Sequence, residues 1–225
     1  MQKNTQLETE LQITTDGSHT LYFAAIDETY HSTHGAIQES MHIFIDAALK
    51  ICTKKTIHIL EIGFGTGLNA LLTAIEAEKS DTNIHYTTLE KFPIPIETAL
   101  QLNYSSILSK KTIFVKLQNS DWEKKIEISS HFYIQKLKCD FTETTFNNKF
   151  DIVYFDAFSP DKQPEMWTEQ QFRKIFDACN SDAILTTYCA KGMVRRALLS
   201  AGFKVERLLG PPGKREILRA RKEGK

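Results

Sequence analysis

The sequence predicts an α/β domain built on one open, mostly parallel β-sheet of seven strands, preceded by a small hairpin and a helix. From Thr56 onward, short apolar runs rich in β-branched residues alternate with longer stretches of helical spacing, as in the βα units of a parallel sheet. The last two apolar runs flank a tight turn, so we expect them to close the sheet as an antiparallel pair. A chain of 225 residues suits one such domain.

We expect the chain to divide into an accessory segment over residues 1–50 and a core over residues 51–225. A hairpin is expected around Leu11 to Ile26 and a helix from Ala36 to Leu49. In the core, a glycine-rich turn separates the strand Ile57 to Ile62 from a helix at Thr66 to Glu78, whose apolar residues share one face. The next expected elements are a strand at 84–89, a helix at 95–104, helix and loop at 108–130, and a strand at 131–138.

The second half continues the alternation. The run Phe150 to Phe155 is apolar at nearly every position, which predicts a strand that is buried on both faces. A turn at Gly210-Pro211-Pro212-Gly213 separates the two closing strands. The elements expected here are a helix at 164–179, a strand at 183–188, a helix at 192–200, and strands at 203–208 and 216–220.

Composition narrows the class of partner. Twenty-eight basic residues balance twenty-eight acidic ones, so any contact with a polyanion needs a local patch. The polar stretch Met1 to Gln12 and the lack of a long apolar run indicate no leader and no membrane span, and we expect a cytoplasmic protein. The four cysteines and seven histidines are scattered, so we expect no metal site.

The strongest local signal is the turn between the first core strand and its helix, where three glycines alternate from Gly63 to Gly67. Alternate glycines permit positive φ and close approach of the backbone to a ligand, and the helix N-terminus offers N–H donors to a carboxylate. A tight turn without a ligand explains one or two glycines better than three. We therefore expect a cofactor to contact Gly63, Phe64, Gly65, Thr66, Gly67 and Asn69.

The glycine turn alone does not identify the cofactor, because Gly65-x-Gly67-x-x-Ala70 also fits a dinucleotide fingerprint. Glu61, just before the turn, would repel a pyrophosphate but suits the ammonium end of methionine, directly or through water. This favours S-adenosylmethionine.

Carboxylates after the next two strands extend the expected cofactor site. Glu90 ends the second core strand about twenty residues beyond the turn, where a carboxylate accepts from the ribose hydroxyls of either nucleotide. Asp140, after the third strand, is placed to accept from an adenine amino group or to cap the following turn. Lys91, beside Glu90, is included among the expected cofactor contacts.

Asp156 is the best catalytic candidate and a further cofactor contact. It follows the most apolar strand, so its carboxylate emerges at the sheet edge where open α/β sheets bind ligands. Methyl transfer needs an unprotonated nucleophile, and a carboxylate beside an amine can hold or take its proton. A structural cap for the next helix is the alternative role.

Flat and basic side chains are expected around a substrate. Phe158, Pro160, Met166 and Trp167 offer surfaces on which a base can stack, although helix packing explains them as well. Lys214 and Arg215 belong to a basic C-terminal cluster that suits phosphate contacts or a charged sheet edge. Tyr30, Lys162 and Tyr188 complete the expected substrate contacts.

These motifs together resemble the methyltransferase domain of the MnmC family of tRNA 5-methylaminomethyl-2-thiouridine biosynthesis proteins, including its stand-alone relatives. The resemblance covers most of the chain. It rests on Tyr30-His31-Ser32 with Gly35 and Glu39-Ser40, Glu61 to Asn69, Leu89 to Pro93, Asp156 to Pro160 with Pro164 to Trp167, and Gly213 to Glu216.

The resemblance implies the Rossmann-like fold of a class I S-adenosylmethionine-dependent methyltransferase. It also implies methylation of the aminomethyl nitrogen on the wobble uridine of certain tRNAs, with Asp156 at the amine and the loop from Phe158 to Trp167 around the uridine. We expect that the flavin-dependent oxidoreductase half of the bifunctional relatives is absent and that another route supplies the aminomethyl group. Departures from the family pattern are Ala157 where a glycine is expected, Cys189, and Pro211-Pro212.

Two other functions fit parts of the pattern. A nicotinamide-dependent oxidoreductase would use the glycine turn and Glu90, but no Tyr-x-x-x-Lys or His-Asp proton relay stands out. A catalytically inactive, RNA-binding relative of the same fold would not need both an intact glycine turn and Asp156.

Overall fold

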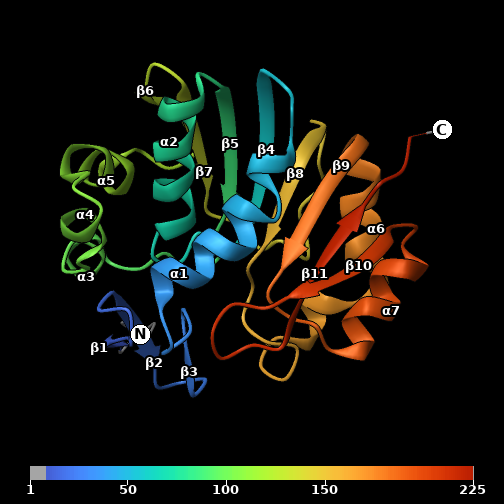
Figure 1. The fold of residues 1–225 in the computed structure, drawn as a ribbon, viewed down its shortest axis with the longest axis horizontal. Coiled ribbons are helices and arrows are strands. Elements are labelled where there is room, and N and C mark those ends of the chain that lie inside the picture. The colour runs from blue at the N-terminus through green and yellow to red at the C-terminus, as the bar shows by residue number, and fades with distance from the viewer. Residues whose placement is uncertain (1–8, 225) are drawn as a thin grey trace, which may run out of the picture.

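The computed structural model describes residues 9–224, and its main sheet contains eight strands in the order β10-β11-β9-β8-β4-β5-β7-β6 (Figure 1). The expected α/β class is confirmed, with one strand more than the sequence predicted. The strands are β4 (Thr56–Ile62), β5 (Asn83–Leu89), β6 (Lys125–Ser129), β7 (Phe132–Leu137), β8 (Phe150–Phe155), β9 (Cys179–Thr187), β10 (Lys204–Leu209) and β11 (Glu216–Arg221).

The centre of the sheet is parallel and its edges are antiparallel. Strands β7, β5, β4, β8 and β9 run parallel, whereas β11 is antiparallel to both β9 and β10, as expected for the closing pair. The chain adds β5 and β7 on one side of β4 and then β8 and β9 on the other. The crevice at the carboxyl ends of β4 and β8 is therefore the ligand position that open α/β sheets favour.

Helices cover both faces of the sheet, with α1 and α2 on one face and α6 and α7 on the other (Figure 1). Ile59 of β4 and Ile152 of β8 pack in the first layer, and Leu60 and Val153, their chain neighbours, pack in the second. Burial on both faces explains why β8 is apolar throughout. The α-helices are α1 (Ala36–Ser40), α2 (Leu68–Ser80), α3 (Ile96–Ala99), α4 (Tyr104–Ile107), α5 (Lys111–Asn119), α6 (Glu169–Ala178) and α7 (Gly192–Ser200).

Three predicted helices are interrupted. The one expected from Ala36 to Leu49 changes to a π-helix at Met41–Asp46 and ends in a 3₁₀ turn at Leu49–Ile51. The one expected at 95–104 is the short α3, because the Asn103 amide bonds the backbone of Gly17 and His19 at 2.8 Å each. The one expected at 164–179 is a 3₁₀ turn (Pro164–Trp167) followed by α6, whose N-cap hydroxyl on Thr168 accepts from the Gln171 N–H.

Strand β6 lies where the sequence predicts only helix and loop. It is a short edge strand, antiparallel to β7, and most of its side chains are exposed or half-buried. Its sequence, Lys-Ile-Glu-Ile-Ser, alternates polar and apolar residues, but five residues are too few to stand out from the charged stretch that contains the amphipathic helix α5.

The N-terminal segment forms a three-stranded antiparallel sheet rather than a plain hairpin, with β1 (Thr9–Ile13), β2 (His19–Phe23) and β3 (Glu28–Thr29). It lies beside the carboxyl ends of the parallel strands (Figure 1). Residues 1–8 of the expected polar N-terminal stretch lie outside the described residues. Within residues 9–224, no helix has the length and apolar character needed to cross a bilayer.

Candidate functional site

A cavity of about 1410 Å³ opens at the carboxyl ends of the parallel strands and brings most of the predicted site together. Its walls come from the turns after β4, β5, β7 and β8, with the N-terminal segment as a cover. The predicted residues that line it are Tyr30, Gly63, Phe64, Gly65, Thr66, Asn69, Glu90, Lys91, Asp140, Asp156, Phe158, Met166, Tyr188 and Lys214.

Six predicted site residues do not line the cavity: Glu61, Gly67, Pro160, Lys162, Trp167 and Arg215. Trp167 is 1% exposed, packs against Phe155 and Phe172, and donates its indole N–H to the Phe158 carbonyl at 2.8 Å. The expectation that Trp167 stacks on a base is therefore corrected, because its ring is buried under the loop that carries Phe158. Pro160 is buried, and Lys162 and Arg215 are exposed outside the cavity.

The glycine turn packs against the protein itself. Gly63 has φ +91°, and a Cβ there would lie 2.7 Å from the Asp156 carbonyl oxygen, so this glycine permits β4 to meet the turn after β8. A Cβ at Gly67, where φ is +76°, would lie 2.6 Å from Gln118 Nε2. We expected these glycines to let the backbone approach a ligand, but at Gly63 and Gly67 they let it approach other parts of the protein chain.

Helix α2 points its N-terminus at the cavity. Its N-cap is Gly67, which has no side chain to cap the first turn, and Thr66, Leu68 and Asn69 line the cavity there. The unpaired N–H groups of a first helical turn attract a carboxylate. The methionine carboxylate of S-adenosylmethionine fits this position.

Glu90 is fixed at the end of β5 by two backbone donors. The Gly65 N–H donates to Oε2 at 3.1 Å and the Phe92 N–H donates to Oε1 at 2.9 Å. Burial raises the pKa of this carboxyl. Each carboxylate oxygen has a second lone pair, so Glu90 can still accept from two ribose hydroxyls.

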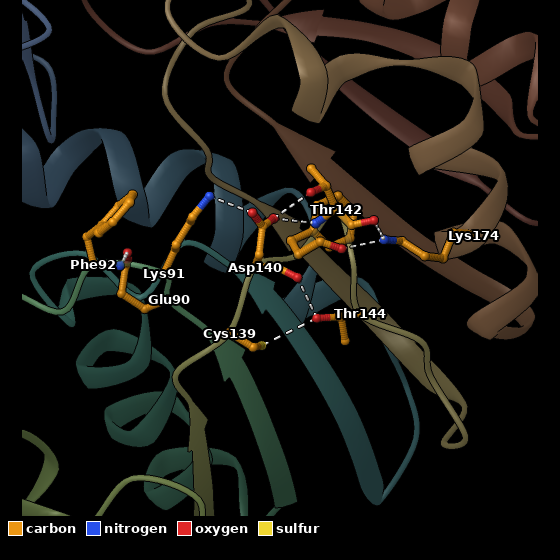
Figure 2. A network of polar contacts seen from close by, with 9 residues as sticks. Glu90, Lys91, Phe92, Cys139, Asp140, Thr142, Thr144 and Lys174 are labelled. Carbon is orange, nitrogen blue, oxygen red and sulfur yellow. Dashed lines mark hydrogen bonds and ion pairs between the residues drawn. The ribbon is translucent and has the colours of Figure 1, made fainter.

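Asp140 and Lys91 both line the cavity and pair with each other, as Figure 2 shows for the pair. Lys91 Nζ lies 2.6 Å from Asp140 Oδ2, and Oδ1 accepts from both the N–H and the hydroxyl of Thr142. The hydrogen bond from Lys91 lowers the pKa of Asp140 to about 2, so this group is ionised at neutral pH. A ligand amino group must share Asp140 with these donors.

The carboxyl of Asp156 has a raised pKa, in contrast to that of Asp140. It follows β8, and the Asn69 side-chain N–H donates to its Oδ2 at 2.8 Å. Burial raises the pKa of Asp156 to about 7, even though the hydrogen bond from Asn69 opposes that shift. A carboxyl group with this pKa can exchange a proton at neutral pH.

Glu39 and Lys214 complete the surroundings of Asp156. Lys214 was among the expected site residues and Glu39 was not. Glu39 is 8% exposed, accepts from the Ser32 N–H at 2.8 Å, and its Oε1 lies 3.3 Å from Lys214 Nζ. Lys214 Nζ also lies 4.9 Å from the centre of the Tyr188 ring. The sequence signal for Glu39 was its place in the Glu39-Ser40 motif, which gave no reason to bring α1 to β8.

Aromatic side chains form another part of the cavity wall. The rings of Tyr30 and Phe158 meet edge to face with centres 5.1 Å apart, and Tyr188 donates its hydroxyl to the Ala157 carbonyl at 2.9 Å. The N-terminal segment is tied to this wall because the Ser159 N–H donates to Glu28 at 3.2 Å.

A family model described as S-adenosyl-L-methionine-dependent methyltransferase matches residues 95–223. The chain belongs to this family. Its cofactor is therefore S-adenosyl-L-methionine, and the cavity residues fit that group: the uncapped N-terminus of α2 suits the methionine carboxylate and Glu90 suits the ribose.

Named relatives agree with the expected resemblance. The MnmC bifunctional tRNA 5-methylaminomethyl-2-thiouridine biosynthesis protein of Campylobacter hominis is 31% identical over 85% of this chain and 29% of its own length, and that of Campylobacter fetus is 28% identical over 89% and 34%. This chain thus spans about a third of the length of these relatives.

Solved structures agree on the fold. MNMC2 from Aquifex aeolicus superposes with a TM-score of 0.75 at 26% identity, covering 99% of this chain and 73% of that one. Spermidine synthase from Thermotoga maritima, at 13% identity and a TM-score of 0.58, covers 97% of this chain and 72% of that one and shares the fold. The comparisons favour neither the oxidoreductase nor the inactive-module alternative.

Proposed function

We propose that this methyltransferase acts on the primary amine of 5-aminomethyl-(2-thio)uridine at the wobble position of tRNA, giving the 5-methylaminomethyl nucleoside. The observation that carries the proposal is the Asp156 carboxyl, which shares one cavity with the cofactor turn and has a pKa of about 7. The names of the MnmC relatives support this substrate class.

Asp156 suits an amine substrate because an amine that enters as an ammonium must lose one proton before its nitrogen can attack. The Asp156 carboxylate takes that proton and becomes a carboxylic acid. The neutral nitrogen would then be free to attack a methyl carbon held in line with it, with formation of a C–N bond and loss of the C–S bond. S-adenosylmethionine supplies a methyl carbon on a cationic sulfur, which leaves as a neutral thioether, and the product is a secondary ammonium.

Glu39 and Lys214 adjust the charge around this step. With Asp156 ionised, the three groups sum to one negative charge, which a substrate ammonium neutralises. Because Lys214 Nζ lies 3.3 Å from Glu39, we propose that this pair restrains the lysine from pairing with Asp156. The aromatic wall of Tyr30 and Phe158 is the proposed support for the uracil ring.

The tRNA backbone needs a local basic surface, because the chain has no net charge. Arg215 is exposed next to Lys214, in the turn between β10 and β11 at the cavity. We propose that this turn contacts phosphates on the anticodon arm. We propose a cytoplasmic location, which suits a tRNA substrate.

Nucleoside mass analysis tests the proposal. Protein and isotope-labelled S-adenosylmethionine are incubated with tRNA that carries 5-aminomethyl-uridine at the wobble position, and with the same tRNA carrying unmodified uridine. The proposal expects one labelled methyl group on the aminomethyl nucleoside and none on the control. Label on another nucleoside, or none in either tRNA, would overturn the proposed substrate.

A further inference from the structure

The peptide group between Thr66 and Gly67 is hydrogen-bonded at both ends, just before α2 begins. Its N–H, on Gly67, donates to the Phe64 carbonyl at 2.9 Å within the cofactor turn. Its carbonyl, on Thr66, accepts from Gln118 Nε2 at 2.8 Å. Gln118 is 8% exposed and lies 52 residues further along the chain, near the end of α5. A side chain from outside the turn therefore fixes the orientation of this peptide group.

The Gln118 amide fits closely against the turn. Its partner is a carbonyl oxygen, so only the NH₂ end of the amide can face Thr66. A Cβ at Gly67 would lie 2.6 Å from Gln118 Nε2, so the absence of a side chain there makes room for the amide. The glycine at the N-cap of α2 thus serves the contact with Gln118 as well as the turn.

Lys136 on β7 fixes the part of α5 that carries Gln118. This lysine is 1% exposed, and its Nζ donates to the carbonyls of Gln118 at 3.0 Å and Leu117 at 3.1 Å. The last carbonyls of a helix have no partner within the helix, and a cation there stabilises them. The same Nζ lies 5.4 Å from the centre of the Phe64 ring and 5.0 Å from that of the Trp122 ring. Burial lowers the pKa of Lys136 to about 8, so the protonated form still dominates at pH 7.

Neither Gln118 nor Lys136 lines the cavity. Their contacts are with the protein itself, on the side of the turn that faces α5 and β7. Any effect of these two side chains on a cofactor must therefore pass through the turn.

We propose that Gln118 is a positioning residue for the methionine carboxylate of S-adenosylmethionine, and that Lys136 acts through Gln118. The Thr66 carbonyl faces Gln118 and the Gly67 N–H is used within the turn, so the N–H groups from Leu68 onward are those left for a ligand. Orientation of these donors before the ligand arrives lowers the cost of binding. The inference concerns the cofactor and does not depend on the proposed tRNA substrate.

The side chain of Thr66 is held separately from its carbonyl. His31 Nε2 lies 2.7 Å from Thr66 Oγ1, and the buried Tyr104 hydroxyl, which has no hydrogen-bond partner within residues 9–224, lies on the same side. These groups remain when Gln118 is replaced. We therefore expect a Gln118 variant to keep the turn in place and to loosen its peptide group.

Two ligands that differ only in the carboxylate test the proposal. S-adenosylmethionine has this group, and decarboxylated S-adenosylmethionine has a hydrogen in its place. Gln118→Met keeps the length of the side chain but has no donor, so we expect it to weaken S-adenosylmethionine binding about 10-fold, the effect of one hydrogen bond. Binding of the decarboxylated ligand is expected to change by less than about 2-fold. Calorimetric titration at pH 7 measures both affinities.

Asn119→Ala is the matched control. Asn119 is the exposed neighbour of Gln118, and its side-chain N–H donates to the Val115 carbonyl of the same helix at 2.8 Å. Both affinities are expected to stay at the wild-type value in this variant. An equal loss for the two ligands in Gln118→Met would make Gln118 a residue that stabilises the fold alone and would overturn the proposal. Unchanged binding of S-adenosylmethionine would overturn it as well.

Lys136→Met tests the second part of the proposal and repeats the ligand comparison without a change at Gln118. We expect a loss of about 3-fold that is confined to S-adenosylmethionine. The double variant is expected to bind no more weakly than Gln118→Met, because the two residues act through one contact. Losses that multiply in the double variant would show that Lys136 acts independently of Gln118.

Hydrogen exchange at the Gly67 N–H reads the turn without any ligand. Gln118→Met is expected to speed this exchange at least about 5-fold, whereas the amides of β4 keep their wild-type rates. A wild-type rate at Gly67 in this variant would contradict the proposed hold on the peptide group.

Discussion

The two ends of the cavity contain aspartates of opposite character. Asp140, after β7, is paired with the exposed Lys91 and has a pKa lowered to about 2, whereas Asp156, after β8, is half-buried at the cavity and desolvation raises its pKa to about 7. The first group is a fixed charge that is suited to binding. The second is suited to proton transfer, so the same residue type serves a different purpose where it is desolvated.

The two ends are also assembled differently. The cofactor end consists of turns that directly follow β4, β5 and β7, so its residues arise from local strand-to-helix geometry. The other end, where we propose that the substrate amine binds, is called the amine end. Four segments meet there around Asp156: α1, the first turn of α2, the end of β8 and the β10–β11 turn. Variants at the two ends should therefore affect different steps.

The largest effect is expected from Asp156→Ala. Loss of the proton acceptor lowers kcat about 10²- to 10⁴-fold, the usual contribution of a general base. Asp161→Asn, in the same loop but exposed and paired with Lys191, is the matched control and retains wild-type kcat. Steady-state methyl transfer to aminomethyl tRNA measures both, and wild-type turnover by Asp156→Ala would remove the assignment.

Glu90→Ala is expected to affect the cofactor end. The loss of a charged acceptor for ribose hydroxyls weakens S-adenosylmethionine binding about 10- to 100-fold. Calorimetric titration measures this change, with the exposed Glu97→Ala as control. Unchanged affinity would show that Glu90 serves only to fix the turn through Gly65 and Phe92.

The raised pKa of Asp156 makes a prediction about stability. Folding favours the neutral form, so the stability that this group contributes is present below its ordinary pKa of 3.8 and is lost as pH rises through about 7. Asp156→Asn stays neutral, so its Tm relative to wild type should rise by several degrees between pH 5 and pH 8, since each pKa unit corresponds to about 1.4 kcal/mol. A Tm difference that does not change with pH would contradict a desolvated Asp156.

Variants of Arg215 and Lys214 are expected to affect different steps, tRNA backbone binding for Arg215 and methyl transfer for Lys214. Arg215 is exposed, so Arg215→Ala is expected to weaken tRNA binding a few-fold and to reduce the salt slope by about one. Lys214 lies inside the cavity on Glu39, so Lys214→Met should change kcat more than it changes that slope. Binding titrations at several salt concentrations distinguish them, and equal slopes for wild type and Arg215→Ala would make the turn a charged surface only.

The smallest effect is expected from Lys91→Met. The Lys91 ammonium is exposed, and exposed ion pairs contribute about 0 to 1 kcal/mol, so S-adenosylmethionine affinity should change by less than about 5-fold. The pKa of Asp140 should rise toward its ordinary value, which titration by NMR measures. A large loss of affinity would show that Lys91 itself contacts the cofactor.

The sequence predicted the cofactor end better than the amine end, for a physical reason. Gly63, Glu90 and Asp140 each follow a strand of the parallel sheet, and the carboxyl ends of parallel strands lie together at one sheet edge. The Glu39–Lys214 pair depends on how distant segments cross that edge, which no local pattern specifies. Glu61 was assigned to the ligand because sequence position does not reveal which way a buried carboxyl points.

Part of the fold also escaped prediction. Strand β6 is short and mostly exposed, and the helix at 95–104 ends early because Asn103 bonds the β1–β2 turn, a tertiary contact that overrides helical spacing.

The most direct test measures cofactor affinity and the single-turnover rate of methyl transfer together in Asp156→Asn and Glu90→Ala. We predict that Asp156→Asn binds S-adenosylmethionine within about 3-fold of wild type but transfers methyl at least about 100-fold more slowly, whereas Glu90→Ala binds weakly and recovers its rate at saturating cofactor. Equal changes of affinity and rate in both variants would contradict the separation of the cavity into a cofactor end and an amine end.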